Sequence, residues 1–382
     1  GINAIFVGAL DSTEKHFLVN ASANAAYAEP GYLLYMRDKA LVAQAFDGRH
    51  FVLSGEPRTL SDEVLFFPQV YRAVFDVFRG EVLVTQTGKG VYLSQLTWFD
   101  RKGKPVGTIA KPAWYSNVQL SPDGRRVAAD VTDPDGRNVD VWVQDPARDA
   151  ATRLTFDPAL DMTPVWSPDG KQLVISSNRS LIFRLYLKNA DGSGADEEIA
   201  AGGTAQMNAL NWSRNGKYIL VRMANQLWYL TWPERVVNPL IQAKWVVRSA
   251  ELSPDGRWVA YASNESGSME VYVSPFPNVA SKWQISSGGG QEPRWRKDGR
   301  ELFYLSREGK LVAVSVSAGA SFEASSPVTL FQTRRRPPIS SQDLFSYAVS
   351  DDGQRFLIAT NVDEANTAPL SVVLNWASEM EK

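Results

Sequence analysis

Apolar and polar positions along this chain form short alternating segments that are separated by one recurring turn. The sequence Ser-Pro-Asp-Gly stands at 121–124, 167–170 and 253–256, and looser copies of it end at Gly216, Gly299 and Gly353. A short apolar segment lies on each side of the turn, as in Thr163–Trp166 and Gln172–Ile175. Proline presets φ, aspartate bonds the nearby backbone and glycine accepts a positive φ, so each copy predicts a β-hairpin.

Two further strands are predicted after each hairpin. The third strand has an aromatic residue inside an alternating run, as in Asp140–Val143 and Glu270–Val273, and the fourth is a short run such as Thr152–Thr155. Four short strands in each repeat of 40 to 54 residues are typical of a propeller blade. No stretch has sustained helical spacing of apolar residues. The expected fold class is therefore all-β, a β-propeller of four-stranded antiparallel blades.

The number of hairpins predicts the number of blades. Two degenerate hairpins, Tyr27–Tyr35 and Ala73–Val84, precede the six that carry the turn. We therefore expect eight blades, or seven if one degenerate copy is only a long loop. Because the repeat is uninterrupted and the composition does not change along the chain, we expect a single β-propeller domain over residues 1–382.

The two ends of the chain do not fit this spacing. Ala4–Val7 and Phe17–Val19 look like outer blade strands without a hairpin of their own, and only Ser371–Leu374 follows the last hairpin. If N-terminal strands join the C-terminal blade, the ring closes and loses its exposed edges. We expect a ring closed by N- and C-terminal strands in this way. The first residue, Gly1, also leads us to expect a mature or excised fragment.

Composition narrows the classes of partner. The 382 residues include 40 basic and 42 acidic side chains, so no overall charge favours nucleic acid or an anionic membrane. No apolar run is long enough to cross a bilayer, no signal peptide is visible and cysteine is absent. The lack of cysteine excludes disulfides and thiol catalysis and is compatible with export. We interpret the basic run Arg334–Arg336 as a solvated loop.

Residues with catalytic or metal-binding chemistry are sparse. The two histidines, His16 and His50, stand far from any nucleophile motif, and we expect both at the surface. The oxygen-rich segment Asp133–Asp140 lacks the glycine position and the closing glutamate of a calcium loop, so we interpret it as a solvent-facing connection. The run Gly288–Gly290 precedes a strand rather than a helix and does not predict a phosphate site. We expect no catalytic residue, no metal and no cofactor.

Most aromatic residues follow the repeat, and packing explains them. Trp166, Trp212 and Trp295 stand just before the turn, where we expect contacts between blades. Residues out of register with the turn fall in connections on the opposite face, where loops on a rigid scaffold carry recognition. The candidate ligand- or partner-binding residues are Tyr71, Arg72, Trp114, Tyr115, Asn117, Asp161, Met162, Asn178, Arg179, Gln206, Asn208, Trp245, Arg248, Asn264, Glu265, Gln291, Glu292 and Arg294.

The repeated hairpins resemble those of known propellers. Ser-Pro-Asp-Gly followed by an apolar and then an aromatic strand resembles the WD-like repeats of TolB-type β-propellers, most clearly over residues 118–310. Several stretches also resemble the C-terminal extracytoplasmic propeller of bacterial membrane-anchored serine/threonine kinases: Pro30–Tyr35, Leu96–Gly103, Val165–Gly170, Gly290–Trp295 and Val372–Trp376. That resemblance implies a kinase and one membrane span ahead of the propeller. This chain has no kinase motif and no membrane span, so the resemblance implies no catalytic activity for the chain.

These observations lead us to expect a non-catalytic binding, sensing or protein-interaction propeller, the sensor part of a larger bacterial signalling protein. Its partner would be a protein, peptide or small-molecule ligand on one propeller face, and not nucleic acid. By resemblance, the location would be extracytoplasmic, periplasmic or at the cell surface, and the fragment would be monomeric. Two alternatives stay open: a propeller-type hydrolase or lyase that uses carboxylates near the channel, and the propeller domain of a serine peptidase without its catalytic domain.

Overall fold

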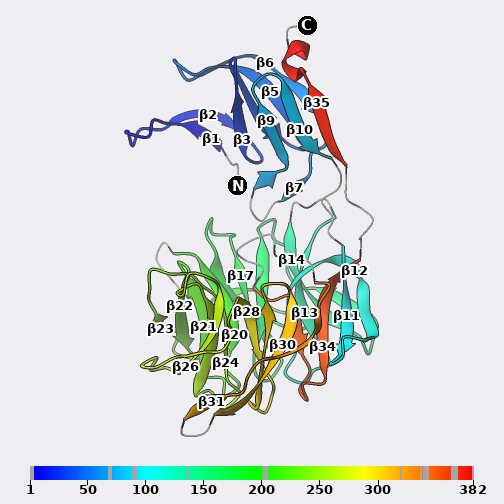
Figure 1. Ribbon diagram of the computed structural model, residues 1–382, viewed down its shortest axis with the longest axis vertical. Coiled ribbons are helices and arrows are strands. Elements are labelled where there is room, and N and C mark those ends of the chain that lie inside the picture. The colour runs from blue at the N-terminus through cyan, green and yellow to red at the C-terminus, as the bar shows by residue number, and fades with distance from the viewer. Residues whose placement is uncertain are drawn as a thin grey trace. The chain divides into compact units, whose positions relative to one another are not determined.

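The chain forms two compact units built almost entirely from β-strands (Figure 1). The computed structural model describes residues 4–67, 71–87, 93–134, 136, 138–200, 205–318, 321–335, 338, 344–362 and 369–380. Unit 1 comprises residues 1–91, 134–137 and 364–382, and unit 2 comprises residues 92–133 and 138–363. This division differs from the single domain expected over residues 1–382.

Unit 1 combines strands from both ends of the chain. Its strands are β1 (Ala4–Val7), β2 (His16–Asn20), β3 (Ala25–Ala28), β4 (Tyr32–Arg37), β5 (Ala40–Asp47), β6 (Val52–Ser61), β7 (Phe66–Phe67), β8 (Arg72–Ala73), β9 (Phe75–Phe78), β10 (Val82–Gln86) and β35 (Leu370–Leu374). They pair as β1-β2, β3-β4-β5-β6, β7-β8 and β35-β10-β9. Figure 1 shows β35, in red, beside the blue β10. The 3₁₀ helix η2 (Trp376–Glu379) follows β35, and the ring of Trp376 is buried in the core of this unit.

Unit 2 is made of antiparallel sheets, three of which contain four consecutive strands each. These twelve strands are β16 (Asp161–Trp166), β17 (Gln172–Ser177), β18 (Arg184–Asn189), β19 (Glu197–Glu198), β20 (Met207–Trp212), β21 (Tyr218–Met223), β22 (Gln226–Thr231), β23 (Val237–Ile241), β24 (Val247–Leu252), β25 (Trp258–Ser263), β26 (Glu270–Pro275) and β27 (Trp283–Gln284). A fourth sheet has β28 (Gly290–Trp295), β29 (Glu301–Ser306), β30 (Lys310–Ala318), β31 (Phe322–Ala324) and β32 (Val328–Gln332).

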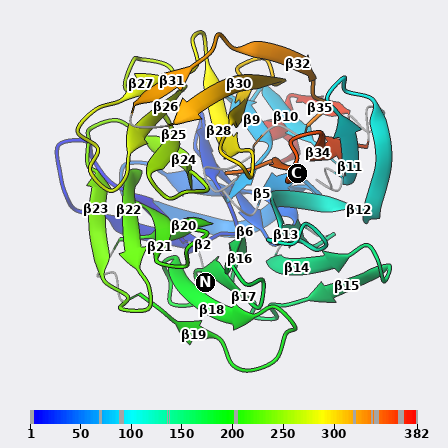
Figure 2. The same ribbon diagram turned by 90° about the horizontal axis from the view of Figure 1, so that it is seen from below.

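The remaining strands of unit 2 close a ring. They are β11 (Ser94–Asp100), β12 (Pro105–Leu120), β13 (Val127–Thr132), β14 (Val139–Asp145), β15 (Ala150–Arg153), β33 (Tyr347–Val349) and β34 (Arg355–Asn361). The long β12 serves two sheets, because its first part pairs with β11 and its second part pairs with β13. Each first strand contacts the first strand of the next sheet, in the order β12, β16, β20, β24, β28, β33 and back to β12 (Figure 2).

This closure corrects two expectations about the ring. Within the described residues of unit 2, five sheets complete the circle, and they give six blade-like groups because the seven-stranded sheet divides at β12; the expected eight blades, or seven, are not confirmed. The degenerate hairpins Tyr27–Tyr35 and Ala73–Val84 supply β3–β4 and β9–β10, which belong to unit 1. The N-terminal strands β1 and β2 pair with each other rather than with the C-terminal blade. The strand that closes the ring is β11, which pairs with β34 from Ser94↔Asn361 to Asp100↔Arg355.

The predicted turns and the packing role of the recurring tryptophans are confirmed. Gly124, Gly170 and Gly256 have φ of 69°, 68° and 71°, the left-handed values that the turn requires. Trp166 and Trp295 are 6% and 4% exposed. The indole Nε1 of Trp166 donates to the carbonyl of Gln119 at 3.3 Å, and that of Trp295 donates to the carbonyl of Glu251 at 3.2 Å. Each tryptophan therefore joins its own sheet to the preceding one.

Candidate functional site

The candidate residues are divided between the two units and differ widely in burial. Tyr71 and Arg72 lie at β8 in unit 1, and the other sixteen lie in unit 2, near the face opposite the turns, which we call the connection face. Eight of the eighteen are buried: Trp114, Tyr115, Asn117, Asp161, Met162, Asn208, Glu292 and Arg294. Five are half-buried: Asn178, Arg179, Arg248, Glu265 and Gln291. Five are exposed: Tyr71, Arg72, Gln206, Trp245 and Asn264.

Asn117 and Glu292 are buried where the inner strands deviate from regular pairing. They have φ of 50° and 56°, and each lies at an irregularity in the register of its strand. The Asn117 Nδ2 donates to Asp130 Oδ2 at 2.6 Å, while its Oδ1 accepts from the backbone N–H of Leu344 at 2.8 Å. The Glu292 carboxylate accepts from the backbone N–H and the hydroxyl of Ser346, at 2.6 and 2.8 Å. These side chains join sheets to one another, and their polar atoms are already hydrogen-bonded within the protein.

Arg294 spans the same region. It donates to the carbonyl of Val118 at 3.1 Å and to Gln119 Oε1 at 3.2 Å, and its guanidinium carbon lies 3.7 Å from the centre of the Phe345 ring. Its Nη1 is 3.7 Å from Glu251 Oε2. Burial raises the pKa of Glu251, while the positive charge of Arg294 acts to lower it. Arg294 thus bridges β28 to β12 and compensates a largely buried carboxylate.

Other candidates hold the connections in place. Arg179 donates to Asp161 Oδ1 at 3.0 Å and to Asp196 Oδ2 at 2.7 Å. Burial raises the pKa of Asp161 in spite of this pairing. The Oδ1 of Asn178 accepts from the N–H of Leu160 at 2.8 Å.

Arg335, part of the basic run, also differs from expectation. Its side chain is only 10% exposed, and its Nη1 lies 3.5 Å from Glu292 Oε1, so it is not part of a solvated loop. The third member of the run, Arg336, lies outside the described residues.

One groove brings two candidates together in an arrangement that suits a ligand. This groove, which we call the Trp245 groove, has a volume of about 380 Å³ and is lined by Trp245, Glu265, Ser266, Tyr272, Lys282 and Gln284. Trp245 comes from the connection into β24, Glu265 and Ser266 come from the connection between β25 and β26, and the others lie on or next to β26 and β27. Asn264, beside Glu265, fixes the first connection, since its Oδ1 accepts from the N–H of Val246 at 2.7 Å.

The aromatic and charged groups of the Trp245 groove face one another. Trp245 is 39% exposed, and it is the one tryptophan of twelve, all of them described, that is exposed by more than a third. The Lys282 Nζ lies 5.9 Å from the centre of the Trp245 ring and 5.5 Å from that of the Tyr272 ring. It also forms an ion pair with Glu265 Oε2. The groove therefore combines a carboxylate with two aromatic faces, a combination that attracts cations.

Sequence reasoning found Trp245 and Glu265 but missed Tyr272 and Lys282. Tyr272 is the aromatic residue of the third strand, a position that the repeat explains by packing. The sequence does not mark Lys282 as a binding residue, because many polar residues of this chain also stand just before a short fourth strand. The side-chain directions that bring both to Trp245 depend on the pairing of β26 with β27.

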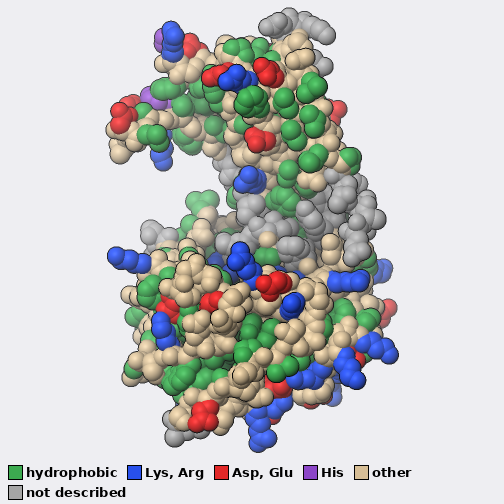
Figure 3. Space-filling model, viewed as in Figure 1, with side chains coloured by type: hydrophobic (Ala, Val, Ile, Leu, Met, Phe, Trp, Pro, Cys, Tyr) green, Lys and Arg blue, Asp and Glu red, His purple; other side chains and the backbone are tan. Residues whose placement is uncertain are grey.

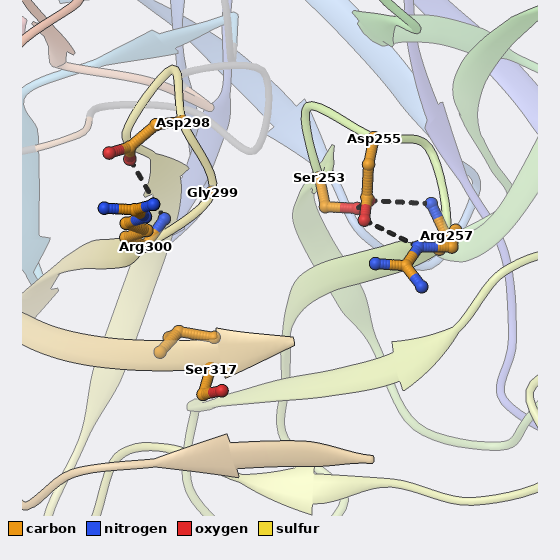
Figure 4. A pocket seen from close by; sticks show the side chains of 8 residues that line it. Ser253, Asp255, Arg257, Asp298, Gly299, Arg300 and Ser317 are labelled. Carbon is orange, nitrogen blue, oxygen red and sulfur yellow. Dashed lines mark hydrogen bonds and ion pairs between the residues drawn. The ribbon is translucent and has the colours of Figure 1, made fainter. Parts of the chain in front are cut away.

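A second hollow lies among the turns. It has a volume of about 470 Å³ and lies between the turns that precede β25 and β29 (Figure 4). Its acids are bound to local partners: Asp255 accepts from the Ser253 hydroxyl at 2.6 Å and from Arg257 Nε at 2.7 Å, and Asp298 accepts from the N–H of Arg300 at 3.0 Å. These contacts stabilise the turns themselves, and we expect no ligand there.

Metal and membrane features are limited in the described part of the chain. No cluster of three or more histidine, aspartate or glutamate side chains there could hold a metal ion. Both histidines are exposed, and the Asp47 carboxylate raises the pKa of His50 by hydrogen bonding to it. No helix among the described residues is long and apolar enough to cross a membrane.

Asp140 differs from the solvent-facing connection that was expected around it, because it is buried and paired with Arg153 at 2.6 Å. Asp135 and Arg137 of that connection lie outside the described residues.

Basic, acidic and apolar side chains are mixed over the face of unit 2 that Figure 3 shows. This mixture agrees with the formal net charge of −2.

Comparison with known proteins identifies the fold class of the chain. No family model matches the chain. The putative TolB from Agrobacterium tumefaciens is 17% identical, with a TM-score of 0.52, and the match covers 70% of this chain and 97% of that one. TolB from Acinetobacter baumannii is 14% identical, with a TM-score of 0.47 and coverages of 64% and 68%. The Cps50 (Swd1) β-propeller domain of Myceliophteria thermophila is 13% identical, with a TM-score of 0.43 and coverages of 80% and 97%. The first of these shows a TolB-like β-propeller fold, which confirms the expected fold class.

Proposed function

We propose that this chain is a non-catalytic binding propeller that takes a peptide or protein partner at the Trp245 groove. The single observation that carries the proposal is the exposed indole of Trp245 beside the buried side chain of Glu265 and the exposed side chain of Lys282. Exposed tryptophans in a fixed position supply much of the binding energy at protein interfaces. The connections that bear Trp245 and Glu265 are held by a closed ring of sheets, so the groove is formed before the partner arrives.

We further propose that the chain is the sensing part of a larger bacterial signalling protein, located outside the cytoplasm. The stretches Pro30–Tyr35, Leu96–Gly103 and Gly290–Trp295 support this by their resemblance to the propellers of membrane-anchored kinases. The TolB-like fold agrees with it. The coding sequence upstream of Gly1 tests the proposal directly. A kinase and a membrane span there would support it, and an α/β-hydrolase encoded downstream would instead favour the peptidase alternative.

The binding role is tested with an array of random pentadecapeptides probed with the wild-type chain and with a Trp245→Ala variant. We expect the strongest peptides to lose about thirtyfold in affinity in the variant, the effect of removing a central aromatic residue from an interface. A Phe156→Ala variant is the matched control, because Phe156 is 71% exposed and has Arg153 over its ring at 5.1 Å but lies outside the groove. Equal binding by wild type and Trp245→Ala would contradict the proposal, and so would turnover of peptides or glycosides without stable binding.

A further inference from the structure

We propose that the Trp245 groove binds an arginine side chain of the partner, and that Lys282 occupies the arginine position until the partner displaces it. This inference rests on the proposed function, since it names the chemical class that the binding groove recognises. It makes Lys282 an internal competitor rather than a contact residue for the ligand.

The first argument is the incomplete pairing of Glu265. The Glu265 side chain is 7% exposed, so its carboxylate is more than nine-tenths buried. Its Oε2 is paired with Lys282, whereas its Oε1 is buried without a hydrogen-bond partner among the described residues. A buried carboxylate oxygen without a donor is costly, which means that a ligand able to supply one gains affinity.

The second argument is the shape of the missing donor. An ammonium group is a point charge, and that of Lys282 reaches one oxygen of the carboxylate. A guanidinium presents two parallel N–H groups in a planar fork that matches both oxygens of a carboxylate. An arginine side chain therefore pairs with Oε1 as well as Oε2, which the resident lysine does not.

The third argument is the aromatic surface. The Lys282 Nζ lies within 6 Å of both ring centres, at 5.9 Å from Trp245 and 5.5 Å from Tyr272, where a cation is attracted to the ring face. A guanidinium stacks on such rings better than an ammonium does, because it is planar and more weakly hydrated. The 39% exposure of Trp245 leaves part of its ring free to receive the ligand.

Lys282 can leave the groove at moderate cost. Its side chain is 52% exposed, so it exchanges a partly solvated ion pair for water when the ligand enters. The groove volume of about 380 Å³ lies at the low end of the range of about 300–1,000 Å³ that is typical of small-ligand sites. An acidic ligand is disfavoured, since it would bring a second negative charge to Glu265.

The test uses three short peptides, each of six alanines around one central residue: arginine, citrulline or lysine. The full chain is labelled with 5-fluorotryptophan, and the ¹⁹F resonance of Trp245 is identified by its absence in a Trp245→Phe variant. We expect a saturable shift of this resonance with the arginine peptide, a weaker one with lysine and none with citrulline. Equal response to arginine and citrulline would overturn the inference, since the two side chains have nearly the same shape and differ in charge.

Variants of Lys282 separate a competitor from a contact. Lys282→Ala removes the resident cation, and we expect it to bind the arginine peptide about fivefold to thirtyfold more tightly. Lys282→Arg supplies a resident guanidinium and should bind it more weakly than wild type. Glu265→Gln should abolish binding, whereas Lys244→Ala, which alters an exposed lysine outside the groove, should not change it. Weaker binding by Lys282→Ala would overturn the inference.

Two measurements keep the outcomes distinct. Thermal unfolding of each variant is followed by circular dichroism, and Lys282→Arg, which keeps the charge, decides the question if Lys282→Ala is unstable. If array peptides bind in a Trp245-dependent manner without arginine, this inference fails while the proposed binding role stands. If no array peptide depends on Trp245, both fail.

Discussion

At the scale of single residues, burial decides which polar side chains build the fold and which can bind a partner. Arg294, Glu292 and Asn117 lie on the face where recognition was expected, yet each is at most 6% exposed and bonded to a neighbouring sheet. These three residues lie on the strands β12 and β28, whereas Trp245 lies in the connection before β24 and is 39% exposed. The partners that bury Asn117 and Glu292, among them Leu344 and Ser346, are remote in the chain, so the sequence near these residues does not show the difference.

The role of Arg294 gives a prediction about stability. Arg294→Ala should lower the free energy of unfolding by about 3–5 kcal/mol, because it leaves Glu251 as a buried charge without its partner. Burial already raises the pKa of Glu251, and loss of Arg294 should raise that pKa further. A carboxyl with a raised folded-state pKa destabilises the fold when it is ionised. The loss of unfolding free energy in Arg294→Ala should therefore become smaller as the pH falls through the pKa of Glu251.

Urea unfolding of Arg294→Ala at several pH values measures this effect. Arg300→Ala is the control, since Arg300 is exposed, and we expect it to change stability by no more than about 0.5 kcal/mol. If Arg294→Ala lost the same unfolding free energy at neutral and at acidic pH, Glu251 would not be the charge that the substitution leaves without a partner.

At the scale of elements, the recurring turn is a small network of side chains that ends one strand and starts the next. In the copy at 167–170, the Ser167 Oγ donates to Asp169 Oδ1 at 2.6 Å and accepts from the N–H of Gln172 at 2.9 Å. Asp169 Oδ1 also accepts from the N–H of Lys171 at 3.1 Å. The looser copy ending at Gly216 keeps the same contacts with Asn215 in place of aspartate. A side-chain oxygen is therefore required at this position, and a charge is not.

Substitutions in this turn should separate hydrogen bonding from charge. Ser167→Ala removes both hydrogen bonds of the hydroxyl and should cost about 1–3 kcal/mol of unfolding free energy. The hydrogen bond from Ser167 lowers the pKa of Asp169, so the stabilisation that Asp169 provides is present above its unfolded pKa and is lost as the pH falls. Asp169→Asn should be nearly neutral at pH 7 and should lose less stability on acidification.

Thermal unfolding at neutral and acidic pH compares the two variants with wild type. The natural Asn215 copy serves as the internal control, since Asn215→Asp should add acid sensitivity where Asp169→Asn removes it. A large loss at neutral pH in Asp169→Asn would contradict the equivalence of the two side chains.

At the scale of the whole molecule, the chain leaves unit 1, forms a ring and returns to unit 1. The ring is closed by β11 with β34, whose residues are separated by more than 250 positions in the chain. Unit 1 is completed in the same way, because β10 pairs with β35. A ring of sheets without a free edge in this seam resists pairing with other chains.

This topology predicts which fragments fold. A fragment of residues 92–363 contains every strand of the ring and should show cooperative thermal unfolding with a β-type circular dichroism spectrum. A fragment of residues 92–350 lacks β34, exposes the edge of β11 that β34 covers and should aggregate or fail to unfold cooperatively. Equal cooperativity of the two fragments would mean that the β11–β34 seam does not close the ring.

The sequence by itself determined the local structure: the turns, the hairpins that they join, the packing role of Trp166 and Trp295, and hence the propeller class. Turn chemistry acts within a few residues, so it can be read without the fold. Only the tertiary structure decided that six hairpins form the ring and that two others build unit 1, because strand pairing between distant segments depends on which surfaces can be buried together. It also decided the site. Trp245, Glu265 and Lys282 come from three separate connections, and their approach follows from sheet geometry rather than from any local signal.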